Sequence, residues 1–423
     1  MRLVLTALLA LAPLQLQAAT TPVTAWTDEA DAFGNGLANW HSLAVMHMAM
    51  HDALNAAEPV YARWAPATVA EPSPGSALPQ AAMETAAAAV LEALHPSHRG
   101  EIASFLADRI GALPAGLARD RGQKLGSIIG AATVARRDGD GFEQNRLFAG
   151  SDVPGVWRPT PPRHQSSGTT RTRPFLFPSR TSILEQPPPE PGSPRYLADV
   201  DVTRRLGGAV SPNRTPEQAE AAIFWAYQST QRGYVHLAAT LIDTEPERFS
   251  LADQARIMSQ LTAAMADSAI LIWAAKERWA YWRPVDAIRS GQFGVPPDPA
   301  WEAFIETPPH PEYPSGHAAD CYTGAGYIAA SLLPAGPLTY TAQSAPTTAT
   351  RRAEIWSSDM GAAPAPVELT ATPRQFPTLA AAAQQCADAR IWAGAHFPSA
   401  NEESRRISAF IVRQAVSVLP RLP

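Results

Sequence analysis

The chain has 423 residues, a formal net charge of −5, 46% hydrophobic residues and 17% charged residues. This balance is ordinary for a globular protein, and it gives no electrostatic reason to expect nucleic acid as a partner. The length is sufficient for a large core divided among two or three domain-sized units.

The first 19 residues have the composition of a secretory signal. Arg2 precedes an apolar run over residues 3–12, and small residues follow at Ala18 and Ala19. The run is too short to span a bilayer, so we predict a cleavable signal peptide over residues 1–19 and a periplasmic or secreted mature protein. A buried first helix is the alternative. We find no later segment with the composition of a membrane span and predict no integral membrane association.

Residues 20–150 are rich in Ala and Leu with helical spacing, and they predict an N-terminal helical bundle. Within it, His47 and His51 lie one helical turn apart and Asp52 follows. This spacing is compatible with zinc, but no third ligand presents itself. We therefore favour a structural role for these side chains.

Residues 151–210 are a Pro-rich segment that includes the run Pro187-Pro-Pro-Glu-Pro191. Its lack of periodicity predicts a long excursion over the surface. Arg171 and Arg173 lie in it and are compatible with attracting an anionic substrate. A solvated loop is the favoured interpretation of these two arginines.

Helical patterns return over residues 211–423, where we predict a C-terminal helical bundle. Thr215 followed by Pro-Glu-Gln predicts a capped helix start. Ser250 introduces a long apolar helix that ends near Lys276, and residues 379–392 form a further helix. No alternation is strong enough to indicate a sheet, so the predicted fold class is all-α.

Three short stretches of this C-terminal half concentrate cations and imidazoles. They are Lys276-Glu-Arg-Trp-Ala-Tyr-Trp-Arg283-Pro284, Pro314-Ser315-Gly316-His317 and Arg390-Ile-Trp-Ala-Gly-Ala-His396. Guanidinium forks match the oxygens of phosphate or vanadate, and an ammonium adds a point charge. A Ser-Gly turn that opens a helix adds a hydroxyl and backbone N–H groups. The two histidines remain for chemistry, so the pattern predicts a site for a tetrahedral oxyanion.

Together the three stretches resemble the signature shared by vanadium-dependent haloperoxidases and acid phosphatases of the type 2 phosphatidic acid phosphatase superfamily. Each stretch is weak alone, whereas all three in this order are specific. Further runs resemble the bacterial haloperoxidase-like branch: Gly155-Val-Trp-Arg-Pro-Thr-Pro-Pro162, Phe224-Trp225, Trp282-Arg-Pro-Val-Asp-Ala-Ile-Arg289 and His310-Pro-Glu-Tyr-Pro-Ser-Gly-His317. The resemblance implies two stacked helical bundles, with the long Pro-rich excursion wrapped around them and shaping the entrance.

The resemblance also implies residue roles. His396 is similar to the residue bonded to vanadium, or to the phosphorylated nucleophile of a phosphatase, and His317 to the acid–base residue. Lys276 is also similar to the lysine that polarises bound peroxide in the haloperoxidases. The groups similar to those that hydrogen-bond the equatorial oxygens are Lys276, Arg283, Ser315, Gly316 and Arg390. His310 is similar to a halide-pocket residue and favours bromide or iodide.

One position departs from the family pattern. The third motif of the family usually has Asp four residues after its histidine, where it accepts the second imidazole N–H, but here that position is Ala400. Ala389 likewise stands where many relatives have Ser. Asn401, Glu402 or a backbone carbonyl are the replacements that we consider for orienting His396.

Cys321 lies four residues after His317, and Cys386 lies four residues before Arg390. On helices, each cysteine falls one turn from a site residue. In an exported protein the pair is compatible with a disulfide joining two walls of the site, and equally with two buried thiols.

Three functional classes follow from this pattern. The first is an exported vanadium-dependent haloperoxidase, with vanadate as cofactor, hydrogen peroxide and halide as substrates, and a small organic acceptor. The second is an acid phosphatase that acts on a phosphomonoester through a phosphohistidine and needs no cofactor. The third is a non-catalytic binder of phosphate or vanadate. The oligomeric state is left open.

Overall fold

The computed structural model describes residues 20–33, 37–65, 75–142, 147–159, 168–180, 183, 186–227, 230–332, 340–342 and 374–423. The predicted signal peptide lies outside these residues. Thirteen α-helices dominate the described part of the chain, and the all-α prediction is confirmed.

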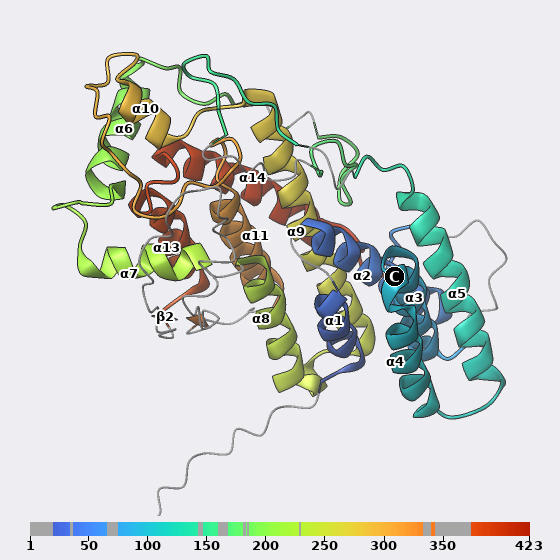
Figure 1. Cartoon of the computed structure of the whole chain (residues 1–423). Coiled ribbons are helices and arrows are strands. Elements are labelled where there is room, and N and C mark those ends of the chain that lie inside the picture. The colour runs from blue at the N-terminus through green and yellow to red at the C-terminus, as the bar shows by residue number, and fades with distance from the viewer. Residues whose placement is uncertain are drawn as a thin grey trace, which may run out of the picture.

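The N-terminal helices group together on one side of the molecule (Figure 1). They are α1 (Pro22–Phe33), α2 (Leu37–Ala57), α3 (Pro79–Leu94), α4 (Arg99–Gly111) and α5 (Leu117–Arg137), with the short 3-10 helix η1 (Pro96–His98) before α4. Small residues allow α3 and α5 to pack closely, because a Cβ on Gly126 of α5 would lie 2.2 Å from the carbonyl oxygen of Ala82 on α3.

The remaining helices form the other side of the molecule. They are α6 (Pro194–Gly207), α7 (Pro216–Tyr227), α8 (Thr230–Thr244), α9 (Leu251–Trp279), α10 (Pro284–Ser290), α11 (Gly316–Ser331), α13 (Leu379–Trp392) and α14 (Pro398–Ser417), with the 3-10 helix η3 (Pro246–Arg248) before α9. Figure 1 shows α9 running between the two groups, and its residues join α2 to α11 and α14 in one core.

The long helix α9 begins as the sequence predicts. Ser250 and Asp253 form a capping box at its start. Among the described residues α9 is the one helix long and apolar enough to cross a membrane, and its apolar stretch is wholly buried. The prediction that no later segment has this composition is wrong for α9, because a helix at the centre of a core is apolar on every side.

The Pro-rich segment crosses from α5 to α6 and is attached both to the middle of α9 and to the residue that follows its C-terminal end. The N–H groups of Phe175 and Leu176 donate to Asp267 on α9 at 2.7 and 2.9 Å. Trp157 N–H donates to the carbonyl of Ala280, just beyond α9, at 2.6 Å. The segment ends in α6, a helix that the excursion prediction missed although its Ser-Pro start is a recognisable cap.

The structure also contains a small sheet that the sequence does not indicate. Strands β1 (Tyr340–Ala342) and β2 (Arg374–Phe376) pair antiparallel, with Tyr340 opposite Phe376. Three residues per strand are too few for an alternating pattern to be recognised.

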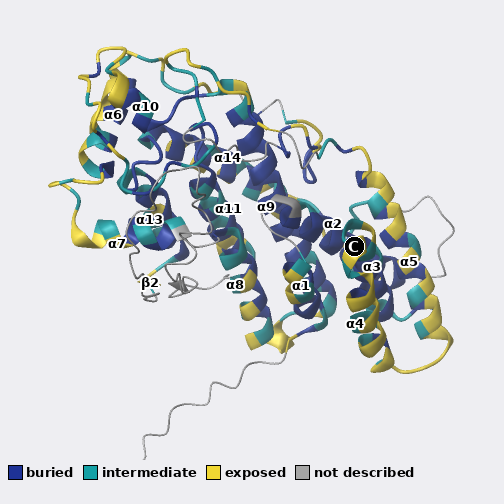
Figure 2. Ribbon diagram, in the orientation of Figure 1, coloured by how far each residue is buried: buried dark blue, intermediate teal, exposed yellow. Residues whose placement is uncertain are grey.

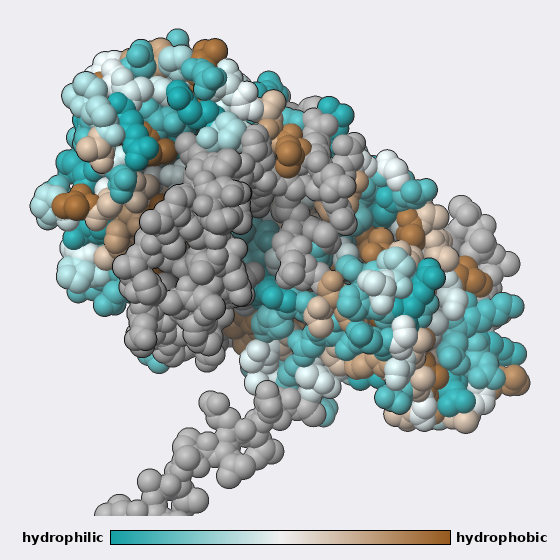
Figure 3. Space-filling view, in the orientation of Figure 1, coloured by the Kyte–Doolittle hydropathy of each residue, from teal (hydrophilic) through white to brown (hydrophobic). Residues whose placement is uncertain are grey.

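Burial follows the helical faces. Figure 2 shows buried residues along α9, α11 and α14 and exposed residues on the outer faces of α4, α5 and α6. On the face seen in Figure 3, hydrophilic residues cover most of the described surface and hydrophobic ones form small separate patches. The apolar residues are therefore mostly inside, and the elements that carry the three motifs meet there.

Candidate oxyanion site

The first motif places two cations at the end of α9 and the start of α10. Ala280 has left-handed backbone with φ of 41°, so α9 ends one turn after Lys276. Arg283 then occupies the N-cap position of α10, and its side chain makes no capping hydrogen bond. Both cationic side chains have 0% exposure.

Backbone carbonyls that precede the second motif hold these cations. Lys276 Nζ donates to the carbonyl oxygens of Pro311 at 2.6 Å and Glu312 at 2.9 Å. Arg283 Nε donates to the carbonyl oxygen of His310 at 2.8 Å. Buried cations need such acceptors, and the loop therefore folds against the end of α9.

The second motif opens α11 at the same place. Ser315 is the N-cap, and its Oγ accepts a hydrogen bond from Ala318 N–H at 3.5 Å. A Cβ on Gly316 would lie 3.2 Å from the ring of Trp273, so glycine lets α11 start directly against α9. The first-turn N–H groups of a helix favour an anion nearby. Within the described residues, the partly exposed His317 ring makes no hydrogen bond.

The third motif turns back on itself after α13. Arg390 lies in the last turn of α13 and is 2% exposed. Gly394 has φ of +75°, and a Cβ there would lie 2.3 Å from the carbonyl oxygen of Gly207. Glycine is therefore required at this turn, which returns His396 to the helix end, where its N–H donates to the Arg390 carbonyl at 3.2 Å.

Arg283 joins the first motif to the third. Its Nη1 donates to the carbonyl oxygen of Ala395 at 2.6 Å and lies 3.2 Å from His396 Nε2. A guanidinium can only donate, so Nε2 accepts and carries a lone pair. The ring proton is then on Nδ1, which lies 3.0 Å from Oε1 of Glu312. The two contacts together define one neutral tautomer.

Glu312 is the functional residue that the sequence reasoning missed. Its Oε1 also accepts the N–H of Phe397 at 2.9 Å, and its side chain is 0% exposed. The alternatives considered for orienting His396 are wrong: Asn401 donates to a carbonyl of α13 at 2.6 Å, and Glu402 pairs with an exposed arginine at 2.6 Å. The acceptor is a carboxylate five residues before His317, and the only sequence signal was its place inside the second motif region.

His310 lies beside this network. Its Nδ1 is 3.0 Å from Arg283 Nη2, and its ring centroid is 5.4 Å from that of Trp273. The side chain is 7% exposed. His310 therefore contacts the cationic group of the site directly.

Burial and the clustered positive charges shift the pKa values of the titratable groups in this site. Burial lowers the pKa of Lys276 well below its ordinary value, and Arg283 and Arg390 lower it further. Burial and these cations also lower the pKa values of His317 and His396 well below 6.5. Burial raises the pKa of Glu312 to about 7, against hydrogen bonding from Phe397 and the nearby cations.

A multiply charged oxyanion fits these residues. Lys276, Arg283 and Arg390 are buried close to the carboxylate of Glu312, and Asp286 also lies near Arg283. The cations outnumber these carboxylates, and buried charge of one sign is costly unless an opposite charge joins it. Among the described residues no group of three His, Cys, Asp or Glu side chains is arranged for a bare metal ion. The donors suit vanadate or phosphate held through its oxygens.

The structure brings all the residues predicted for this site into one region. They are Lys276, Arg283, His310, Ser315, Gly316, His317, Arg390 and His396. The Ser315 Oγ accepts a hydrogen bond from the backbone as the helix cap, so its O–H proton is still available for donation to an oxyanion.

Comparison with known proteins agrees with this geometry. Residues 256–422 match the family model described as the VCPO second helical-bundle domain. The vanadium chloroperoxidase of Curvularia inaequalis is 28% identical over 149 residues, which are 29% of this chain and 24% of that protein. The predicted resemblance to the vanadium haloperoxidases is confirmed. The chain matches only about a quarter of the length of this curated relative.

Solved structures of vanadium haloperoxidases share the whole fold. A bacterial vanadium-dependent iodoperoxidase has a TM-score of 0.71 at 20% identity, covering 95% of this chain and 96% of the other. An apo bacterial vanadium-dependent chloroperoxidase has a TM-score of 0.66 at 16% identity, covering 89% and 92%. The stretch matched by the haloperoxidase family model contains every predicted site residue.

A disulfide joins two walls of the site in this haloperoxidase fold. Cys321 of α11 and Cys386 of α13 are bonded, with their Cα atoms 6.5 Å apart. Of the two interpretations left open by the sequence, the structure has the disulfide. It ties the helix that begins at Gly316 to the helix that carries Arg390.

His47 and His51 have structural contacts in the N-terminal half. The ring nitrogens of His47 each lie 3.0 Å from a protein oxygen, and His51 Nε2 lies 3.0 Å from a backbone carbonyl. Asp52 accepts two backbone N–H bonds of 2.7 Å. Burial lowers the pKa of both histidines to about 4. These contacts agree with the structural interpretation.

Proposed function

We propose that the protein is an enzyme, a vanadium-dependent haloperoxidase that oxidises bromide or iodide with hydrogen peroxide. The observation that carries this proposal is the tautomer of His396, whose Nε2 lone pair faces Arg283 while Nδ1–H is held by Glu312. A neutral imidazole nitrogen with its other nitrogen anchored is the form that binds a metal centre.

The residues around His396 have separable tasks in this proposal. Vanadate, when bound, supplies Lewis-acid activation of hydrogen peroxide. Lys276, Arg283 and Arg390 balance the charge of the oxyanion, and burial strengthens each of these interactions. His317 is neutral because its pKa is lowered, so it can accept a proton from hydrogen peroxide and return one to the departing oxygen.

The preference for bromide or iodide is supported by His310, which contacts Arg283 inside the site. One structural neighbour is described as an iodoperoxidase, in agreement with this choice, whereas another is described as a chloroperoxidase. The oxidised halogen then passes to a small organic acceptor. Comparing initial rates with chloride, bromide and iodide tests the order of preference.

We also propose that the mature protein is exported to the periplasm or beyond. The support is the signal-like composition of residues 1–19 and the disulfide between Cys321 and Cys386, which suits an oxidising compartment. Mass spectrometry of the N-terminus from a periplasmic or culture fraction should locate cleavage near Ala18 or Ala19. An uncleaved chain retained in the cytoplasm contradicts the proposal.

An acid phosphatase is the second candidate, because the same Nε2 lone pair can attack phosphorus and the same cations can balance phosphate. His317, once it has taken up a proton, would then donate it to the leaving alcohol. The non-catalytic alternative was suggested by Ala400, which cannot accept the second imidazole N–H. Glu312 accepts that hydrogen bond, so Ala400 no longer favours this alternative.

One pair of assays separates these candidates. Protein incubated with orthovanadate should brominate monochlorodimedone with peroxide and bromide, and His396→Ala should not. Hydrolysis of p-nitrophenyl phosphate without halogenation selects the phosphatase. Inactivity in both assays, together with tight phosphate binding, selects the non-catalytic binder and overturns both enzymatic proposals.

A further inference from the structure

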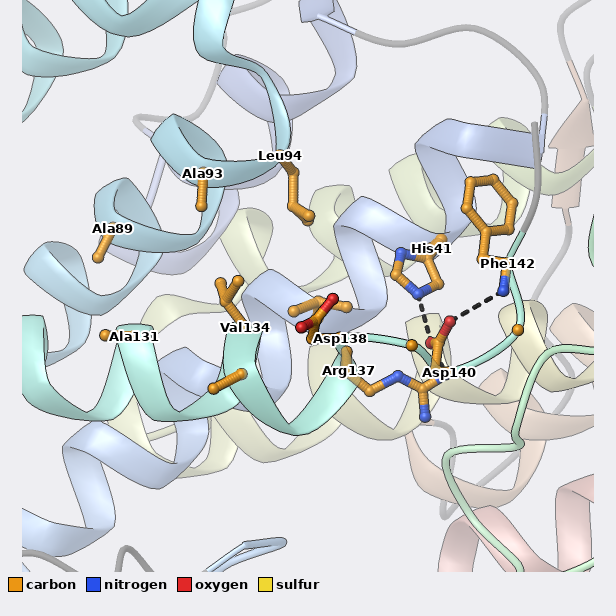
Figure 4. Close-up of a pocket in the computed structure, with 14 residues that line it drawn as sticks. His41, Ala89, Ala93, Leu94, Ala131, Val134, Arg137, Asp138, Asp140 and Phe142 are labelled. Carbon is orange, nitrogen blue, oxygen red and sulfur yellow. Dashed lines mark hydrogen bonds and ion pairs between the residues drawn. The ribbon is translucent and has the colours of Figure 1, made fainter. Parts of the chain in front are cut away.

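A cavity of about 520 Å³ lies among α2, α3, α5 and the turn after α5 (Figure 4). None of its lining residues belongs to the oxyanion site. The volume lies within the range of sites for small organic molecules, which are mostly apolar with a few placed polar groups. The mechanism proposed above makes no use of this cavity.

The cavity arises where the close packing of α3 and α5 stops. One ridge of α5 has a residue every four positions, namely Gly122, Gly126, Gly130 and Val134, and Asp138 follows as the C-cap residue. The three glycines allow α3 to pack directly against the backbone of α5. A Cβ on Gly130, for example, would lie 2.7 Å from the Cβ of Ala89. Val134 and Asp138 line the cavity instead, so the helices separate where the glycines end.

The walls beyond this point are apolar and small. Ala89 and Ala93 of α3 face Ala131 and Ala135 of α5, and Leu94 closes one side. Figure 4 shows Ala89, Ala93 and Leu94 on one side of the opening and Ala131 and Val134 on the other. Ala93, Ala131 and Ala135 are exposed, so the cavity is open to solvent.

The opposite end of the cavity is polar and rigid. His41 Nε2 lies 2.8 Å from Asp140 Oδ2, and Arg137 Nη2 lies 2.6 Å from the same oxygen. Phe142 N–H donates to Asp140 Oδ1 at 3.0 Å, and its ring stacks on His41 at 4.9 Å. Because Asp140 contacts His41, Arg137 and the Phe142 N–H together, the polar wall is organised before any ligand arrives.

The charge that remains for a ligand is negative. Arg137 balances the charge of Asp140, and its Nη atoms donate to two backbone carbonyls of the Pro-rich segment at 3.4 and 2.6 Å, whereas its buried Nε has no partner among the described residues. Asp138 is exposed at the rim, and within the described chain its carboxylate has no ion pair. Figure 4 shows Asp138 beside Val134, between the apolar walls and the His41 end.

We propose that this cavity binds a small amphiphilic cation, with an aryl or alkyl body against the alanines and a protonated amine at Asp138. Charge complementarity selects the cation, and the alanine walls select a flat or narrow body. The proposal does not depend on the proposed haloperoxidase activity.

The test uses the full chain and three probes with the same aromatic body. They are phenethylammonium, neutral 3-phenylpropanol and anionic 3-phenylpropionate, and binding is measured by ligand-observed NMR titration. We expect phenethylammonium to bind with a Kd on the order of 1 mM and the anion at least about tenfold more weakly. Absence of phenethylammonium binding, or equal binding of the anion, overturns the proposal.

Variants locate the binding site. Ala131→Phe fills the cavity and should weaken binding at least about tenfold, whereas Ala132→Phe, on the same helix but outside the lining, should not. Asp138→Asn should remove the preference for the cation and leave the binding of 3-phenylpropanol unchanged. Asp120→Asn, which removes one negative charge at another exposed position, is the matched control. Thermal melts check folding of each variant. Equal effects within either pair contradict the proposal.

Discussion

Glu312 accepts a hydrogen bond from His396 across 84 residues of sequence, with His396 Nδ1 3.0 Å from Glu312 Oε1 and neither side chain more than 1% exposed. The same oxygen accepts the N–H of Phe397. One carboxylate thus fixes both the ring and the backbone of the residue that faces the cations. The acceptor for the imidazole N–H of the third motif therefore comes from Glu312, just before the second motif.

Replacing Glu312 should therefore weaken oxyanion binding without removing any cation. We expect Glu312→Gln to raise the Kd for vanadate by about 10- to 100-fold. The amide of glutamine can donate an N–H to Nδ1 of His396, so the ring proton is no longer held on Nδ1. Titration of purified protein with vanadate measures the affinity, and ¹⁵N shifts of His396 report the tautomer. Glu402→Gln is the control, because it makes the same substitution at an exposed position of α14. If the ¹⁵N shifts of His396 in Glu312→Gln equal those of the wild type, the role assigned to Glu312 is wrong.

Oxyanion binding should be accompanied by proton uptake. Burial and like charges lower the pKa of Lys276 in the free protein, and a bound anion raises it again. Between the two pKa values the complex holds more protons than the free protein, so affinity falls as pH rises. Calorimetry in buffers of different ionisation enthalpy measures the uptake. We expect the Lys276→Met variant to take up fewer protons than the wild type when the oxyanion binds. Proton release by the wild type on binding would contradict this account.

Asp267 should stabilise the wrapped Pro-rich segment through Phe175 and Leu176. Asp267→Ala leaves two buried N–H groups without their acceptor, at a cost of about 1–3 kcal/mol each in the free energy of unfolding. Urea unfolding measures the loss. Asp201→Asn, which breaks an exposed ion pair with Arg205, should change stability by less than about 1 kcal/mol.

The Asp267 carboxyl also has a pH signature. Burial raises its pKa to about 7, outweighing the two N–H bonds that lower it, whereas an unfolded aspartate has a pKa near its ordinary value of 3.8. The folded state therefore binds more protons between these values, and the contribution is complete below about pH 4 and lost as pH rises through about 7. Asp267→Asn should flatten this part of the stability profile. An identical slope in the variant and wild type contradicts the assignment.

The disulfide closes a long loop across the site. Cys321 and Cys386 are separated by 65 residues, for which loop-closure entropy gives about 4 kcal/mol of stabilisation. The double variant Cys321→Ser/Cys386→Ser should melt at a lower temperature and lose its sensitivity to reductant. If dithiothreitol leaves the wild-type melting temperature unchanged under conditions that reduce the bond, the bond does not stabilise the fold.

The glycine ridge of α5 predicts opposite results for two similar substitutions. Gly126→Ala places a Cβ 2.2 Å from a carbonyl of α3 and should destabilise the protein by about 1–3 kcal/mol. Gly100→Ala, on α4 with nothing within 4 Å, should stabilise it by about 0.4–1 kcal/mol. Thermal unfolding of both variants measures the difference. Equal shifts would mean that α3 and α5 do not touch at Gly126.

Local sequence determined the elements and the choice of site residues. The cap at Ser250, the helix that ends after Lys276 and the helix start at Ser315 all follow from neighbouring residues, because capping and helical periodicity act within a few positions. The spacing of the three motifs was specific enough to indicate an oxyanion site before any geometry was known.

Tertiary structure alone decided how distant segments complete one another. Nothing near His396 in sequence indicates that Glu312 orients it, and the alanines of α3 and α5 do not show where the helices separate. The choice between a disulfide and two thiols also required the distance between α11 and α13. Such contacts depend on how helices pack over tens of residues, whereas sequence patterns report mainly on the preferences of each helix and turn.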